Sequence, residues 1–127
     1  MDNCVCGSGK KTDLCCGPFL DGTQNAPTAE ALLRSRYSAY VTGRIDYVKK
    51  TTHKTAISEF DEDSALAWSR NSKWTGLNII STEKGTSEDE EGKVEFVASY
   101  IQKGKEEHHH ERAVFKREGE KWFFLDG

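Results

Sequence analysis

All four cysteines of the chain fall within its first sixteen residues, at Cys4, Cys6, Cys15 and Cys16. They form two close pairs separated by eight residues, so a loop that folds back brings four soft sulfur ligands together. Gly7 and the glycine at position 9 permit the positive φ angles that such a loop needs. The spacing therefore predicts a zinc site with four cysteine ligands.

Two disulfides or four free thiols are the alternatives to a zinc site. The N-terminus lacks the basic start and the apolar run of an export signal, and cytosolic reductants keep thiols reduced. Adjacent Cys15 and Cys16 would pair with each other only under strain. No stretch approaches the roughly 18 apolar residues of a membrane span. We therefore expect a cytoplasmic protein that holds one structural Zn²⁺ ion.

The charge balance argues against nucleic acid as the partner. The chain has 18 basic and 21 acidic side chains, a net charge of −3. Residues 1–55 hold eight basic and five acidic side chains, but four thiolates on one Zn²⁺ would lower the balance of this half to about +1. After this correction for the thiolates, the support for RNA binding rests on Lys10 and Lys11, the basic residues beside the cysteines.

The periodicity of the apolar residues changes from helical to alternating near residue 73. Leu33, Tyr37, Tyr40 and Val41 recur at helical intervals, and Gly43 suits a helix C-terminus. The pattern predicts helices over 27–43, 46–51 and 57–69, and strands over 74–81, 93–102, 108–117 and 121–126. Helices followed by an antiparallel meander are typical of an α+β fold with helices on one face of the sheet.

The cysteine run resembles the SEC-C motif, a short zinc-binding segment best known from the C-terminal tail of the protein-export ATPase SecA. Cys16 takes a place that is often held by histidine, which also binds zinc well. The residues that match the pattern C-x-C-G-S-G-K…C-[HC] are Cys4, Cys6, Gly7, Ser8, Gly9, Lys10, Cys15 and Cys16.

The whole chain resembles the YchJ-like family of uncharacterised bacterial proteins. The resemblance rests on LRSRYSAYV at 33–41, DY at 46–47, TTH at 51–53, WTGL at 74–77, FVA at 96–98, HERAVF at 110–115 and KWFFLDG at 121–127. It implies a nuclear-transport-factor-2-like, cystatin-like cone of N-terminal helices packed on a four-stranded, curved antiparallel sheet. We accordingly divide the chain into an SEC-C-like cysteine motif (residues 1–22) and an α+β domain (residues 23–127).

Alternation along the strands places Glu111 among aromatic side chains on the inner face of this cone. A buried carboxylate needs a partner, because without one its pKa rises, and Arg36 and His53 are the available partners. One interpretation is an Arg36–Glu111 ion pair that fixes the helix on the sheet. The other is a pocket for acid–base chemistry or a polar ligand. Further candidate residues of this pocket are Trp74, Trp122 and Asp126.

A triplet of histidines lies in the third predicted strand. Strand geometry turns His108 and His110 to one face and His109 to the other, so the three cannot bind one metal ion.

Three functions follow from these features. A closed four-cysteine site leaves no coordination position for water, which favours a non-enzymatic adaptor whose zinc knuckle contacts a protein partner. The SEC-C resemblance implies a partner in protein export or translation. The first alternative is a small-ligand binder or enzyme that uses Glu111, His53 and Arg36. The second alternative is an RNA- or ribosome-associated zinc knuckle.

Overall fold

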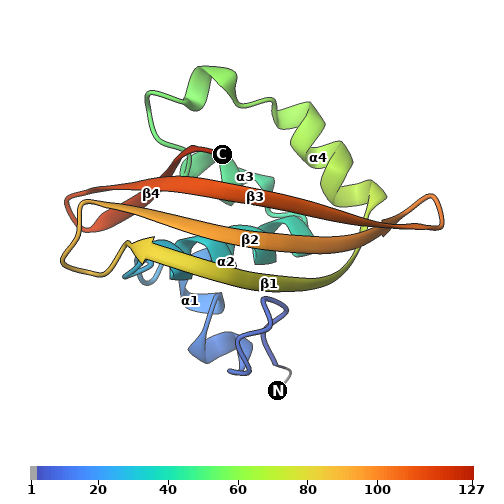
Figure 1. The fold of residues 1–127 in the computed structure, drawn as a ribbon, viewed down its shortest axis with the longest axis horizontal. Helices are drawn as coiled ribbons and strands as arrows, with labels where there is room; N and C mark the ends of the chain where they lie inside the picture. Colours follow the sequence, from blue (N-terminus) through green and yellow to red (C-terminus); the bar gives the residue numbers. More distant parts are fainter. Residues whose placement is uncertain (1–2) are drawn as a thin grey trace.

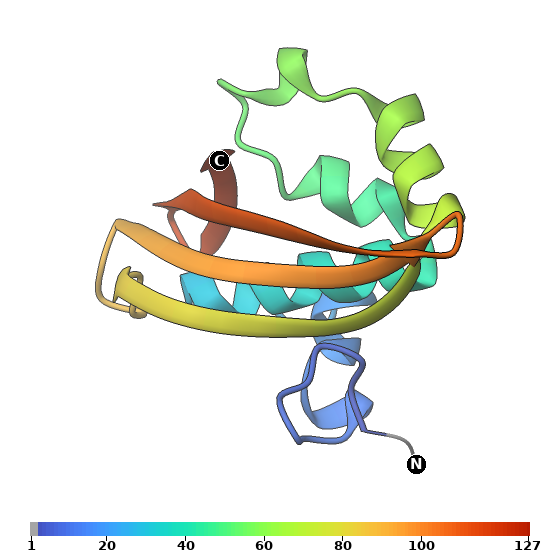
Figure 2. The same ribbon diagram turned by 45° about the vertical axis from the view of Figure 1, so that its right-hand side comes forward.

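Four antiparallel strands joined by short turns form a curved sheet in the order β1-β2-β3-β4 (Figures 1 and 2). The structure is a computed structural model that describes residues 3–127. The tight β2–β3 turn places Lys103 and Gly104 at φ 53° and 76°, as in the primed turns that match the twist of paired strands. The strands are β1 (Lys73–Lys84), β2 (Glu91–Gln102), β3 (Lys105–Glu118) and β4 (Lys121–Asp126).

The helices precede the sheet in the sequence and pack against it, which confirms the predicted α+β class. The longest helix begins after Thr28, whose hydroxyl accepts a hydrogen bond from the Ala31 N–H, and ends at Gly43 with φ 79°. The helical elements are η1 (Thr12–Leu14), α1 (Gly17–Leu20), α2 (Ala29–Thr42), α3 (Ile45–Lys50), η2 (Ile57–Glu59) and α4 (Glu62–Asn71).

Helix α2 is buried on more than the one face that its apolar spacing predicts. Leu32 and Leu33 pack in the core together with residues of the sheet, whereas Tyr40 and Val41 are only half-buried. On another side, the hydroxyls of Ser35 and Tyr47 are 2.7 Å apart, which ties α2 to α3. Small polar residues on the remaining faces of α2 therefore serve as packing surfaces for neighbouring elements.

The predicted helix over residues 57–69 is wrong in its first part. The chain forms the short 3₁₀ turn η2 and then starts α4 after Asp61, whose carboxylate accepts a hydrogen bond from the Ser64 N–H at 3.0 Å. An aspartate at this position satisfies a free N–H of the first helical turn and so fixes where the helix begins.

Two glycines allow the β1–β2 hairpin to approach the start of α2. A Cβ atom on Gly92 would lie 2.4 Å from the Cα of Gly85, and one on Gly85 would lie 2.8 Å from the Cβ of Ala29. The Ala29 N–H donates to the Gly85 carbonyl at 2.9 Å. The loop between β1 and β2 thus makes a close backbone contact with the start of α2.

We expect Gly92→Ala to destabilise the fold by about 1–3 kcal/mol, because the added methyl group has no room beside Gly85. Gly76→Ala in β1 is the matched control, since nothing lies within 4 Å of its Cβ position. Urea denaturation followed by circular dichroism measures both changes. Equal stabilities of the two variants would contradict the close contact.

Candidate metal centre and cavity

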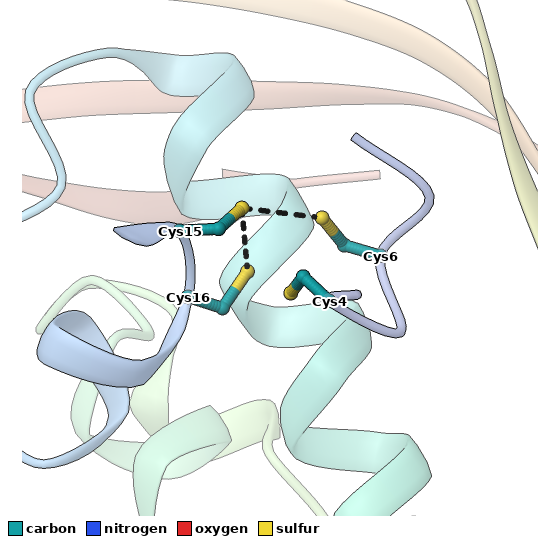
Figure 3. A group of neighbouring side chains, drawn as sticks. All are labelled: Cys4, Cys6, Cys15 and Cys16. Carbon is teal, nitrogen blue, oxygen red and sulfur yellow. Dashed lines mark hydrogen bonds between the residues drawn. The ribbon is translucent and has the colours of Figure 1, made fainter. Parts of the chain in front are cut away.

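The four cysteine sulfurs converge at the N-terminal end of the molecule (Figure 3). All four Sγ atoms lie within 4.8 Å of one another, with Cys6 and Cys15 at 3.5 Å and Cys15 and Cys16 at 3.8 Å. None of the four forms a disulfide. A tetrahedral ion with Zn–S bonds of about 2.3 Å needs sulfurs roughly 3.8 Å apart. The sulfur positions therefore fit one tetrahedral metal ion.

A tight loop brings the two cysteine pairs together. Gly7 and Gly9 have φ angles of 81° and 85°, as their place between the pairs predicts. The Cys4 N–H donates to the Lys10 carbonyl at 2.8 Å, and the Ser8 hydroxyl lies 3.1 Å from the Cys15 sulfur. Backbone closure thus holds the ligands in place from within the motif.

The electrostatics of the cluster favour a thiolate at Cys6, whereas burial raises the pKa of Cys15. The hydrogen bond between Cys6 and Cys16 lowers the pKa of Cys6 to about 4. The same bond raises the pKa of Cys16, and burial is the second cause of that rise. Arg34 in α2 donates to the Cys6 carbonyl at 2.9 Å and lies 3.9 Å from the Cys6 sulfur. Its guanidinium therefore places a positive charge beside the sulfurs.

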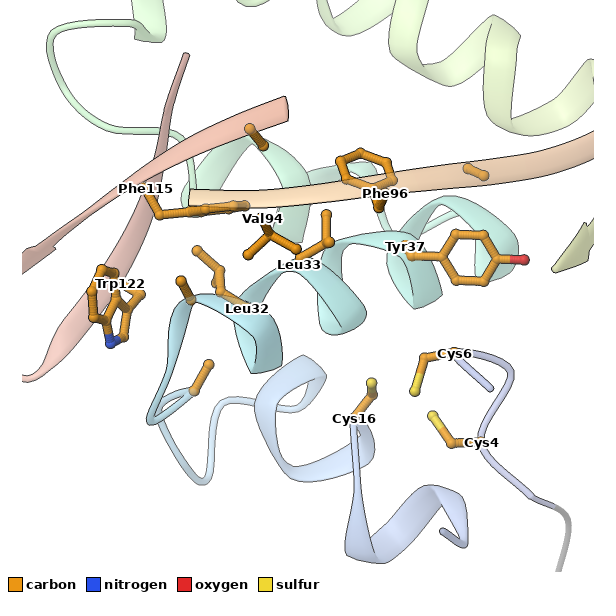
Figure 4. Close-up of a cluster of buried hydrophobic side chains, with 14 residues drawn as sticks. Cys4, Cys6, Cys16, Leu32, Leu33, Tyr37, Val94, Phe96, Phe115 and Trp122 are labelled. Carbon is orange, nitrogen blue, oxygen red and sulfur yellow. The ribbon is translucent and has the colours of Figure 1, made fainter. Parts of the chain in front are cut away.

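The cysteine motif packs directly on the α+β domain (Figure 4). Cys4, Cys6 and Cys16 belong to the same buried cluster as Tyr37 and Phe96 of the domain. The Cys4 sulfur also lies 3.8 Å from the Ser38 hydroxyl of α2. The boundary at residue 22 stays a prediction, but one continuous core joins the segments on its two sides.

A second feature is a cavity of about 400 Å³ lined by residues of α2, α4 and the sheet. Among the pocket residues predicted from the sequence, four line this cavity: Arg36, Trp74, Glu111 and Asp126. His53 and Trp122 are not part of its lining. Four of the six residues predicted for the pocket therefore line this cavity.

The predicted Arg36–Glu111 ion pair is wrong. Arg36 Nη1 donates to the Val48 carbonyl and to the Thr51 hydroxyl, both at 2.8 Å, and the guanidinium lies 4.6 Å from the centre of the Phe124 ring. Burial lowers the pKa of Arg36 to about 10, so the side chain stays charged at neutral pH. Acceptors at the end of α3 replace the expected carboxylate.

His109 is the partner of Glu111. Its Nε2 lies 2.9 Å from Glu111 Oε1, and both side chains line the cavity. The sequence carried a signal for this contact, because residues 109 and 111 share one face of a strand. His110 pairs with Glu95 at 2.6 Å and His108 with Glu106 at 3.3 Å. The expected separation of the three histidines between two faces is confirmed.

His53 and Trp122 have structural roles. The buried imidazole of His53 accepts from the Thr55 N–H through Nδ1 and donates from Nε2 to Glu118 at 2.9 Å. The Trp122 indole N–H donates to the Pro27 carbonyl at 3.2 Å. Both residues therefore connect distant parts of the chain.

Comparisons with known proteins agree with this architecture. A family model described as the YchJ middle NTF2-like domain matches residues 28–127. A UPF0225 protein of Geobacter sulfurreducens is 44% identical over 124 residues, which cover 98% of this chain and 77% of that protein. The solution structure of an SEC-C motif containing protein from Rhodopseudomonas palustris has a TM-score of 0.90 at 40% identity, over 99% of this chain and 97% of that one.

A crystal structure of an SEC-C motif containing protein from Psychrobacter arcticus has a TM-score of 0.81 at 27% identity, over 97% of this chain and 80% of that one. Both structural alignments span nearly the whole chain, so the likeness includes the cysteine motif. In the described part of the chain, no helix has the length and apolar character needed to cross a bilayer.

The His53–Glu118 pair gives a pH-dependent contribution to stability. The hydrogen bond from His53 lowers the pKa of Glu118 below its ordinary value of 4.5. At pH values above this ordinary pKa, the interaction therefore stabilises the folded state. This stabilisation disappears as the pH falls through the lowered pKa of Glu118. We expect Glu118→Gln to reduce the melting temperature near neutral pH, and we expect this deficit to shrink as the pH falls through the lowered pKa of Glu118.

Thermal denaturation by circular dichroism across this pH range measures the difference. Glu120→Gln, an exposed change in the same turn, is the control and should leave the melting temperature unchanged at both ends of the range. A Glu118→Gln deficit that persists undiminished in acid would contradict this account.

Proposed function

The chain belongs to the YchJ-like family, and on that premise we propose that it is a non-enzymatic, zinc-binding adaptor whose cysteine motif binds a protein partner. The observation that carries the proposal is the convergence of four cysteine sulfurs within 4.8 Å. Four thiolates suit Zn²⁺, and a site closed by four protein ligands is structural because no position is left for a reacting water.

Residues Cys4, Cys6, Cys15 and Cys16 would hold the ion. When bound, Zn²⁺ supplies cross-linking of the two cysteine pairs, which stabilises a segment too short to fold alone. Arg34 offsets part of the negative charge of the thiolates from the side of α2. The ion would therefore fix the motif in one orientation on the domain.

Exposed apolar side chains on the motif support a docking role. Leu14 is 73% exposed and Val5 is 47% exposed, and each follows or precedes a cysteine ligand in the sequence. Lys10 and Lys11 in the same loop are also exposed. A protein segment that offers an apolar side chain flanked by carboxylates would complement this surface.

The zinc proposal is tested by native mass spectrometry of untagged protein. We expect one zinc ion per chain, and its removal by a chelator should lower the melting temperature of the whole domain, because three ligands belong to the common core. Cys16→Ser should lose the ion, whereas Ser8→Ala should retain it. Metal-free protein with unchanged stability would refute the proposal.

The adaptor proposal is tested with a photo-reactive amino acid placed at Leu14 or, as control, at the exposed Ile80 of β1. A partner captured only from position 14 should bind the purified protein, and Leu14→Asp should weaken binding roughly tenfold or more. Ile80→Asp should leave binding unchanged. The same affinity for both variants, or capture from both positions, would count against docking through the motif.

A further inference from the structure

We propose that the cavity lined by α2, α4 and the sheet binds a small zwitterion, a molecule with a carboxylate, an ammonium group and an apolar body, of the class of the aromatic α-amino acids. The cavity volume of about 400 Å³ lies within the range of small-molecule sites. None of the four cysteines lines this cavity, so the proposal does not depend on the zinc site.

Arg36 supplies a recognition group for a carboxylate. The residue is only 9% exposed, and its one hydrogen-bonding nitrogen, Nη1, contacts residues of α3 and the segment after it. Within residues 3–127, neither Nε nor Nη2 donates a hydrogen bond, and no carboxylate forms an ion pair with the guanidinium. A buried charge without a counter-charge is costly, and a carboxylate matches the fork of the guanidinium.

Glu111 supplies a recognition group for an ammonium. Its Oε1 is held by His109, whereas its Oε2 accepts no hydrogen bond from any residue of the described chain. The adjacent residue is a glycine, and a Cβ atom on Gly127 would lie 2.5 Å from Oε2. A side chain at position 127 would therefore collide with this oxygen.

The opposite charges of Arg36 and Glu111 line one cavity without neutralising each other. Exposed carboxylates of Glu59, Asp61 and Asp126 also line it and repel a ligand that carries only negative charge. A ligand that carries only positive charge would leave the buried guanidinium of Arg36 without a counter-charge. A zwitterion is the class of ligand that satisfies both ends.

The aromatic lining suits the apolar body of such a ligand. The ring centres of Trp68 and Trp74 lie 5.2 Å apart, and Phe96 and Phe124 also line the cavity. The buried indole nitrogen of Trp74 has no hydrogen-bond partner among the residues described. Aromatic walls are typical of sites that bind planar or apolar molecules.

The test uses L-phenylalanine and its two halves, 3-phenylpropionate without the ammonium group and phenethylamine without the carboxylate. Isothermal titration calorimetry gives the affinities, and amide chemical shifts locate the site. We expect L-phenylalanine to bind at least roughly tenfold more tightly than either half and to shift signals of cavity residues. Equal or tighter binding of either half, or no binding of any probe, would overturn the proposal.

Glu111→Gln separates recognition from folding. This change should weaken L-phenylalanine binding by roughly tenfold or more while leaving 3-phenylpropionate binding no weaker, because only the ammonium contact is lost. Glu95→Gln is the matched control, since Glu95 pairs with His110 in the same two strands but does not line the cavity. Circular dichroism checks that both variants fold. Equal weakening of both probes by Glu111→Gln would contradict the assigned role.

Discussion

Helix α2 makes the contacts on which the rest of the structure depends. Leu32 and Leu33 pack with the sheet, Ser35 bonds to Tyr47 of α3, and Arg34 reaches the backbone of the cysteine motif. One helix thus contributes to the core, the metal centre and the cavity. A displacement of α2 would disturb all three, since close-packed interiors transmit strain rather than absorb it.

Local signals predicted most of the fold. Thr28 and Gly43 bound α2 because their side chain and backbone satisfy groups at the helix ends, and alternation along the strands identified their inner faces. The cysteine spacing predicted the cluster, since a short loop permits few arrangements of four nearby sulfurs. Asp61 carried a similar signal for the start of α4, in its spacing to Ser64, and would have corrected the third helix.

The partners of Arg36 and His53 could not be predicted in the same way. Whether Arg36 meets Glu111 depends on where α3 ends, because the carbonyl of Val48 and the hydroxyl of Thr51 compete for the guanidinium. The partner of His53 likewise lies 65 residues away, at the β3–β4 turn. Such contacts are set by tertiary packing, for which neither periodicity nor spacing carries information.

The bond from the Trp122 indole to the Pro27 carbonyl spans 95 residues and has a consequence for synthesis on the ribosome. The cysteine motif is synthesised before this bond can form, and the segment that leads from the motif into α2 gains the bond only once β4 has been made. Non-local contacts of this kind form late in folding. The four thiols are therefore synthesised before the residues of the sheet with which Cys4, Cys6 and Cys16 share a core, and they meet the metal and redox conditions of the cell before that core is complete.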